Sequence, residues 1–213
     1  MGDIHWIEAQ LDDGENAMNE QLGRSGLTVV TSLGVSVAAL MLAAGAGAGV
    51  SCDNENSAVP ASTPSTVFTQ HDDGTVTHLG TGLMWMRCSL GQTWESDPGT
   101  CEGNASSYVW NNALNAVLSF NAPGGFNGEA GFAGYDDWRM PNRNELATIV
   151  EESCWLPMIN ATLFPNTPGS WYLSASPSAV SAEEVWHIGF GYGTVDSRAK
   201  SSTGVVRLVR GGF

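Results

Sequence analysis

The sequence predicts an α+β fold in which two helices are set among about six short strands. Short runs of β-branched and aromatic residues are bounded by Gly, Pro, Asn and Asp, which is the pattern of strands and turns. Two other stretches repeat apolar residues with the spacing of one helix face. The 213 residues are enough for one domain of ordinary size with its appendages.

Composition limits the partners that the protein can take. The chain carries 22 Asp and Glu against 8 Lys and Arg, a formal net charge of -14. An acidic chain repels polyanions, so nucleic acid is not expected as a partner. Charged residues are scarce, whereas 26 Gly and 8 Trp are present. This mixture is typical of a loop-rich, exported protein rather than of a helical cytosolic enzyme.

Residues 1–52 are predicted to be an N-terminal leader. From residue 27 to residue 50 the chain carries only apolar and small residues, with Arg24 before this run and Cys52 after it. The pattern matches a secretory signal peptide. Because the run is also about long enough to span a bilayer, an uncleaved membrane anchor is the alternative. Residues 50–52 (Val-Ser-Cys) resemble the end of a bacterial lipobox, which makes Cys52 the candidate for lipidation.

Residues 53–66 are predicted to be a flexible linker. They hold Pro60 and Pro64 among small polar residues and almost no large apolar one, so they cannot bury much surface. The folded domain is therefore expected over residues 67–213. No internal repeat, collagen-like period or heptad pattern is expected in it.

The domain is expected to begin with a β-hairpin. Residues 67–69 and 75–77 are β-prone, and Gly74 stands between them where a tight turn needs positive φ. Residues 83–86 (Leu-Met-Trp-Met) predict a buried central strand. The later strand-like runs are residues 171–173, 185–188 and 205–209.

The cysteines predict one disulfide. Cys88 and Cys101 enclose a short loop, and in an exported protein a bridge across it is worth about 3 kcal/mol. Cys154 is left over if Cys52 carries lipid. A buried free thiol is the first interpretation of Cys154, and a bridge to Cys88 or Cys101, or to another molecule, is the alternative.

The first predicted helix follows Ser106 and Ser107, either of which can cap its N-terminus. Residues 123–125 (Pro-Gly-Gly) end it. Its predicted apolar face consists of Trp110, Ala113, Leu114, Val117 and Leu118.

The second predicted helix opens at Asn142, three residues before Glu145, which is the spacing of a capping box. The residues that follow fall on one helix face at the positions i, i+3, i+4 and i+7, so the helix has a surface to pack. They are Leu146, Ile149, Val150 and Ser153.

Six motifs follow one another along residues 67–213. They are residues 73–77 (Asp-Gly-Thr-Val-Thr), 81–85 (Thr-Gly-Leu-Met-Trp), 134–141 (Gly-Tyr-Asp-Asp-Trp-Arg-Met-Pro) with Glu145 and Leu146, 165–168 (Pro-Asn-Thr-Pro), 174–177 (Ser-Ala-Ser-Pro) and 206–210 (Val-Arg-Leu-Val-Arg). Together they resemble a family of bacterial exported proteins, the C-terminal domain of Legionella collagen-like protein. The founding member is an adhesin that binds sulfated polysaccharides and trimerises through a collagen-like stalk. This chain lacks the stalk and is acidic, which argues against heparin-like binding and against trimerisation.

A more distant resemblance concerns the run that opens the second helix. Residues 138–141 (Trp-Arg-Met-Pro) with Glu145 are similar to a Trp-Arg-Leu-Pro run of formylglycine-generating enzymes and C-type-lectin-like domains, and residues 206–210 resemble the closing strand of that group. The resemblance implies a C-type-lectin-like, formylglycine-generating-enzyme-like mixed fold. In that fold two helices flank a twisted antiparallel sheet whose terminal strands meet. It hosts enzymes, lectins and adhesins, so it names no function.

The run before the second helix is interpreted as a structural lock rather than a ligand site. Tyr135 is expected to enter the core with the tryptophan, and the arginine is expected to pair with a carboxylate or with carbonyl groups. Two adjacent carboxylates supply too few oxygens for calcium. The proposed structural residues are Asp137, Trp138, Arg139, Asn142 and Glu145.

The candidate ligand surface is aromatic. A tryptophan can stack on a sugar face while its N–H donates a hydrogen bond. Trp171, Trp186 and Tyr192 are expected to line a glycan groove, by analogy of fold. The domain's histidines His71, His78 and His187 lack metal-ligand spacing, so no metal or cofactor is expected, and no catalytic residue is assigned.

The leading hypothesis is therefore an exported, lipid-anchored, non-catalytic protein of the bacterial cell envelope, in the periplasm or on the cell surface. It would bind a carbohydrate or another envelope component, reach the membrane through its N-terminal lipid or anchor, and form oligomers in some settings. A structural subunit of a cell-surface assembly is one alternative. A divergent enzyme of the formylglycine-generating type is the other.

Overall fold

A computed structural model describes residues 50–212 of the protein. The predicted leader, residues 1–52, lies almost wholly outside this range, as does the apolar run at residues 27–50. None of the helices within residues 50–212 is long and apolar enough to cross a membrane.

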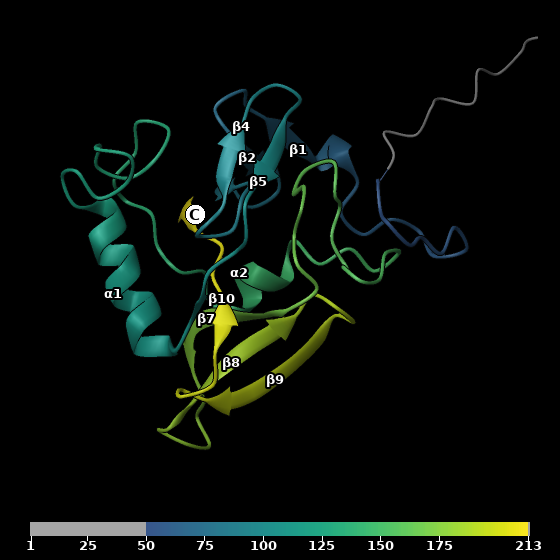
Figure 1. Cartoon of the computed structure of the whole chain (residues 1–213). Helices are drawn as coiled ribbons and strands as arrows, with labels where there is room; N and C mark the ends of the chain where they lie inside the picture. Colours follow the sequence, from purple (N-terminus) through teal and green to yellow (C-terminus); the bar gives the residue numbers. More distant parts are fainter. Residues whose placement is uncertain (1–49, 213) are drawn as a thin grey trace, which may run out of the picture. The chain divides into compact units, whose positions relative to one another are not determined.

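The α+β class is confirmed, with strands dominating (Figure 1). The helical elements are η1 (Ser65–Val67), α1 (Trp110–Asn121) and α2 (Arg143–Ala147). The strands are β1 (Phe68–Gln70), β2 (Thr75–His78), β3 (Leu83–Met86), β4 (Thr93–Glu95), β5 (Thr100–Glu102), β6 (Ser107–Tyr108), β7 (Trp171–Pro177), β8 (Glu184–Gly189), β9 (Thr194–Ala199), β10 (Gly204–Val205) and β11 (Val209–Gly211).

The strands form three sheets, with the orders β1-β2-β3-β11, β6-β10-β7-β8-β9 and β4-β5. Two expectations from the distant resemblance need correction. The first and last strands share one sheet but lie at its opposite edges rather than side by side. The pairing is not purely antiparallel, because β10 runs parallel to β7. The C-type-lectin-like assignment itself stays a prediction.

The opening hairpin and the central strand are confirmed. β1 pairs with β2, and β3 lies between β2 and β11 with Trp85 fully buried. Gly74 has φ of 85°, and a Cβ there would come within 2.5 Å of the Trp94 ring. The hairpin turn therefore requires glycine for its conformation and for its space.

The strand predicted at residues 205–209 is split between two sheets. Val205 pairs with Tyr172 in the five-stranded sheet, whereas Val209 pairs with Trp85 in the four-stranded sheet. Residues 206–208, which connect them, are fully buried. The chain is buried on both sides here because it passes from one sheet to the other. Sequence patterning alone cannot distinguish that path from one continuous strand.

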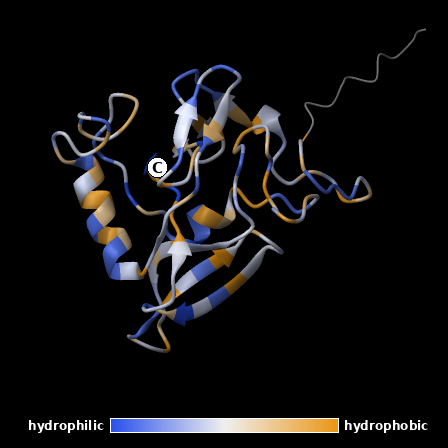
Figure 2. Cartoon of the chain, viewed as in Figure 1, coloured by the Kyte–Doolittle hydropathy of each residue, from blue (hydrophilic) through white to orange (hydrophobic). Residues whose placement is uncertain are grey.

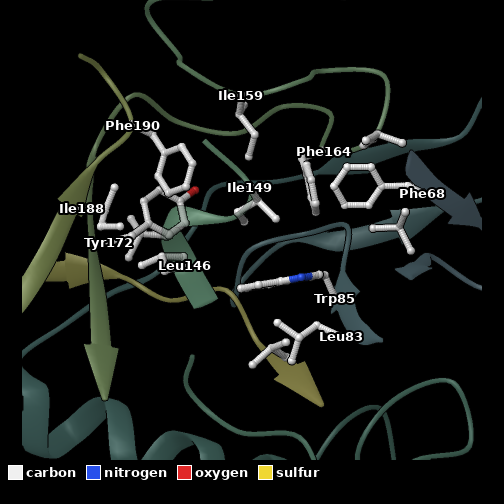
Figure 3. Close-up of a cluster of buried hydrophobic side chains, with 14 residues drawn as sticks. Phe68, Leu83, Trp85, Leu146, Ile149, Ile159, Phe164, Tyr172, Ile188 and Phe190 are labelled. Carbon is white, nitrogen blue, oxygen red and sulfur yellow. The ribbon is translucent and has the colours of Figure 1, made fainter. Parts of the chain in front are cut away.

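The main core fills the space between these sheets (Figure 3). Trp85 of β3 lies within it, with Phe68 and Phe164 packed edge to face at 6.2 Å on one side. Tyr172 and Phe190 contact each other at 4.7 Å on the other side. A second buried cluster lies under α1, whose surface alternates between apolar and polar residues in Figure 2.

The first helix matches its predicted extent but not its predicted cap. Its N-cap is Val109, which makes no side-chain capping hydrogen bond. Ser107 belongs to β6, where it pairs with Val205, so it is not available to cap the helix. The buried face also shifts, because Phe120 is buried while Leu118 is 70% exposed.

The capping box of the second helix is present. The Asn142 side chain accepts a hydrogen bond from the Glu145 backbone N–H at 2.8 Å, and the Asn142 N–H donates to the Glu145 carboxylate at 2.7 Å. The helix nevertheless ends at Ala147, well before Ser153. Beyond it, the backbone N–H of Glu151 donates to the Met158 carbonyl, so the chain turns back into a loop.

The glycine-rich loop between α1 and α2 contains a repeat that was not expected. Phe120, Phe126, Phe132 and Trp138 are six residues apart, and their rings form a chain of contacts with centroid distances of 4.8, 5.7 and 6.4 Å. Between successive rings the backbone makes tight turns, bridged from Phe126 to Glu129 and from Phe132 to Tyr135. The loop is therefore a stack of turns held by aromatic contacts.

Residues 50–66, here called the N-terminal strap, are packed against the domain. This corrects the predicted linker at residues 53–66. Glu55 forms a β-bridge with Cys154, and Thr63 is buried and donates two hydrogen bonds to Glu151. Composition predicted a tether because small polar residues bury little apolar surface, but here polar hydrogen bonds hold the segment.

Two disulfides are present. The predicted Cys88–Cys101 bridge is confirmed. A second bridge joins Cys52 to Cys154, so the free thiol expected at Cys154 is wrong. The same bridge contradicts lipidation of Cys52, because that sulfur cannot hold a thioether lipid and a disulfide together.

Candidate functional site

The run before α2 joins the helix to the end of the chain. The Arg139 guanidinium donates to both carboxylate oxygens of Glu145, at 2.7 and 2.8 Å, and to the Gly211 carbonyl at 3.1 Å. Burial acts to raise the pKa of Glu145, but hydrogen bonds from Arg139 and from the Asn142 backbone lower it overall. The Arg139 backbone also exchanges two hydrogen bonds with Val209. These are the contacts of a structural lock.

Trp138 and Asp137 complete this lock in different ways. Trp138 is buried, and its indole N–H donates to the Phe132 carbonyl at 3.1 Å. Asp137 accepts from Arg210 at 2.6 Å, and this hydrogen bond lowers the pKa of the carboxyl. Tyr135 does not enter the core as expected. It stays partly exposed, with the Arg210 guanidinium 3.7 Å from its ring centroid.

The three predicted ligand-binding aromatics are not brought together. Trp171 and Tyr192 line one shallow pocket of ≈ 180 Å³ at the end of β7 and β8. Trp186 lies elsewhere, under the Arg143 guanidinium at 4.5 Å, in a depression that includes Val180. Alternation in the sheet explains the separation. Trp171 is opposite Gly189, and Trp186 lies three residues before Gly189, so the two indoles point to opposite faces.

The pocket between Trp171 and Tyr192 combines rings, hydroxyls and glycines. Tyr192 is 69% exposed, and the remaining lining residues are Gly169, Ser170, Gly189, Gly191 and Thr194. The Trp171 indole N–H and the hydroxyls of Ser170 and Thr194 make no hydrogen bond within residues 50–212. The lining thus combines two aromatic residues with two hydroxyl-bearing residues, and none of the lining residues is charged.

Two further side chains support Trp171, and sequence reasoning missed their role. The Arg198 guanidinium lies 4.6 Å from the Trp171 ring centroid, and its Nε is buried without a partner. His187 is fully buried and contacts the same indole edge to face at 6.5 Å. Burial lowers the pKa of His187, so its neutral form is favoured. Had β9 been predicted, the alternation of its side chains would have placed Arg198 on the same face of the sheet as Trp171.

Arg207 was missed as well. It is fully buried, and its guanidinium donates to the carbonyls of Met86 and Arg87 and to Thr167 Oγ1 at 2.7 Å. The ring centroid of Phe164 lies 4.8 Å from it. Burial lowers the pKa of this arginine. Its contacts link β3, the chain before β7, and the crossing between the two sheets, so it is a structural residue.

The three histidines of the domain, which the sequence predicts to be scattered, lie in separate parts of the structure. His71 Nε2 lies 2.9 Å from Thr77 Oγ1, and His78 Nδ1 lies 2.8 Å from Thr81 Oγ1. Within residues 50–212 no group of three or more His, Cys, Asp or Glu side chains is placed to hold a metal ion.

A disulfide-bonded α+β domain of this kind belongs to the class of exported or extracellular proteins. The chain belongs to the Lcl C-terminal domain family, whose model matches residues 74–210. The resemblance seen in the six motifs is thereby confirmed, and membership in this family indicates a surface or extracellular protein. Comparison with curated proteins gave no significant match.

Proposed function

We propose that this protein is a non-catalytic, membrane-attached protein of the bacterial cell envelope that binds an uncharged sugar unit in the pocket between Trp171 and Tyr192. Because Cys52 is in a disulfide, the attachment is assigned to the apolar run at residues 27–50 rather than to a lipid. That run is long enough to serve as an anchor.

The pocket is the observation that supports sugar binding. A pyranose ring offers an apolar C–H face for stacking and a rim of hydroxyls for hydrogen bonding. The exposed Tyr192 ring matches the face, and the hydroxyl-bearing lining residues Ser170 and Thr194 match the rim. The lining residues are uncharged, and the nearby Arg198 guanidinium lies against the Trp171 ring, which favours a neutral sugar.

The size of the pocket limits the ligand further. At ≈ 180 Å³ it has room for about one sugar ring rather than an extended chain. Glycines at positions 169, 189 and 191 leave its floor open, and a Cβ at Gly191 would come within 3.1 Å of the Gly169 carbonyl oxygen. A single terminal sugar is the ligand that fits this shape.

A glycan array tests the proposal, using the full chain in mild detergent and variants of the pocket. We expect Y192A and T194V to lose binding to neutral glycans while the fold, followed by circular dichroism, is unchanged. W186A is the matched control, because Trp186 is also a partly exposed aromatic of the same sheet but lies outside the pocket. It should bind like the wild type.

Other outcomes would point to the alternatives. Silence on the array together with self-association in gel filtration would favour a structural subunit of a surface assembly. Co-purified copper, iron or zinc that stabilises the fold would favour an enzyme of the formylglycine-generating type.

A further inference from the structure

A second depression, of ≈ 550 Å³, lies where α2 begins, on the opposite face of the five-stranded sheet from Trp171. Its lining comes from the first residues of α2, the end of β7, the loop after β7, and Trp186 of β8. Figure 1 shows α2 lying against β7 and β8. Arg143 is the one charged residue among the described residues that line it, so it is here called the Arg143 depression.

Arg143 has no counter-charge, although the protein is acidic. Arg139 and Arg210 pair with carboxylates. Arg87 and Arg207 donate hydrogen bonds to carbonyl groups. Arg143, in contrast, makes no ion pair within residues 50–212. Its positive charge is therefore not neutralised by the described part of the chain.

The Arg143 guanidinium is nevertheless held in place. Its central carbon lies 4.5 Å from the Trp186 ring centroid, so the indole covers one of its faces. The Arg143 backbone N–H donates to Ser176 Oγ at 3.0 Å, and its Nε donates to Asn144 Oδ1 at 3.4 Å. A guanidinium fixed in this way loses little side-chain entropy when it binds a ligand.

Two other cations resemble Arg143 in part. Arg198 and Lys200 also lie over indole rings and make no ion pair within the described residues. The Arg198 Nε is buried, however, and Lys200 carries a single ammonium on a flexible stem. Arg143 is the one of the three that combines a planar guanidinium with a place in the lining of the depression.

The charge of the site selects a monovalent carboxylate. A guanidinium binds a carboxylate through two parallel hydrogen bonds. A phosphate monoester carries about 1.5 to 2 negative charges at neutral pH and would need a second cation. No second basic residue lines the depression, and Glu184, two residues before Trp186, lies on the same face of β8 with its carboxylate accepting from Ser197 Oγ at 2.7 Å. A multiply charged ligand would be repelled there.

The rest of the lining indicates what carries the carboxylate. Pro177 and Val180 give the depression an apolar side, and Val180 is 93% exposed. Asn144 and Ser176 give it side chains that hydrogen-bond to an amide. A peptide C-terminus combines these features, because its carboxylate lies next to both a side chain and an amide group.

We propose that the Arg143 depression binds the C-terminal carboxylate of a peptide whose last residue is small and aliphatic. Capture of a terminal carboxylate is an established mode of peptide recognition. The proposal does not rest on sugar binding, because the depression shares no lining residue with the pocket between Trp171 and Tyr192.

Calorimetric titration of the full chain in mild detergent tests this proposal, with N-acetyl-alanyl-alanine as the probe. The same dipeptide with a C-terminal amide should bind about tenfold or more weakly, because it lacks the charge that pairs with Arg143. R143Q should weaken binding of the acid by a similar factor. R143K should recover part of the affinity, because an ammonium keeps the charge but not the two parallel hydrogen bonds.

Two further variants separate binding from folding. V180E places a negative charge at an exposed position of the lining, so it should weaken binding while leaving the melting temperature unchanged. K200Q is the matched control, because Lys200 lies over the Trp110 ring at 4.9 Å but does not line the depression. It should bind the dipeptide like the wild type.

The outcomes that would overturn the proposal are distinct. Equal affinity for the acid and the amide would exclude carboxylate recognition, and so would wild-type binding by a folded R143Q. Binding of glucuronate without binding of the dipeptide would overturn the peptide assignment. Y192A should keep dipeptide binding, so failure of the sugar pocket and failure of the Arg143 depression are separate results.

Discussion

Three charged side chains are buried within residues 50–212, and none of them belongs to an ion pair. Arg87 donates to the carbonyls of residues 162 and 163, and Arg207 donates to carbonyls and hydroxyls. Glu151 accepts five hydrogen bonds from residues 62, 63 and 153. A buried charge without such partners costs several kcal/mol, so these residues fix the chain segments around them.

Glu151 gives the domain an acid-sensitive clamp. Burial acts to raise its pKa, but the hydrogen bonds from Ser153, Ser62 and Thr63 lower it from 4.5 to about 2. A carboxyl whose pKa is depressed on folding stabilises the protein above its unfolded pKa. We expect about 3 kcal/mol of unfolding free energy to be lost as pH falls from about 4.5 to about 2. Urea unfolding at a series of pH values measures this.

A substitution isolates the contribution of this carboxyl. E151Q should unfold more easily at neutral pH and should lose most of the acid dependence. E129Q, which changes an exposed carboxyl of the glycine-rich loop, should keep the wild-type profile. An E151Q profile as steep as that of the wild type would assign the acid sensitivity to other groups.

At the scale of secondary-structure elements, the glycine-rich loop between α1 and α2 is built from tight turns rather than from a helix or a sheet. Each bridged turn has two central residues with positive φ, Asn127 and Gly128 in the first, and Ala133 and Gly134 in the second. Positive φ at both positions defines the turn that suits a two-residue hairpin. Asn tolerates this region, but Ala does not, so the second turn carries strain.

Replacing that alanine should relieve the strain. We expect A133G to raise the unfolding free energy by about 1 kcal/mol, because a left-handed non-glycine residue costs about 1 to 2 kcal/mol. Ala130 lies in the same loop without positive φ, so A130G should be neutral or destabilising. Chemical denaturation of both variants gives the comparison. A stabilising A130G together with a destabilising A133G would show that the turn is not the one described.

At the scale of the whole molecule, the two disulfides constrain very different lengths of chain. Cys88–Cys101 closes a separation of 13 residues, whereas Cys52–Cys154 closes one of 102. The longer bridge fixes the strap to the loop after α2 and so makes residues 50–66 part of the domain. Because the entropy removed from the unfolded chain grows with loop length, the longer bridge should contribute more.

Paired substitutions test this difference. We expect C52S/C154S to lower the unfolding free energy by about 4 to 5 kcal/mol and C88S/C101S to lower it by about 3 kcal/mol. Thermal unfolding of each double variant in the oxidised state measures the two effects. Mass mapping without reduction should also find the peptides of Cys52 and Cys154 joined. A lipid-modified Cys52 peptide would contradict the second bridge.

The sequence by itself determined the features that depend on neighbouring residues. The opening hairpin, the β3 strand and the extent of α1 follow from local periodicity and turn chemistry. The capping box needs residues only three apart, and the Cys88–Cys101 bridge closes a short loop. The order of the motifs sufficed to identify the family.

Only the tertiary structure decided which distant segments meet. It paired Cys52 with Cys154, held the strap on Glu151 and divided residues 205–209 between two sheets. In the candidate site it joined Trp171 to Tyr192 and excluded Trp186. Local patterns specify the backbone conformation of a segment. These contacts depend instead on the path of the whole chain, and that path is set by interactions between residues that can be more than a hundred positions apart.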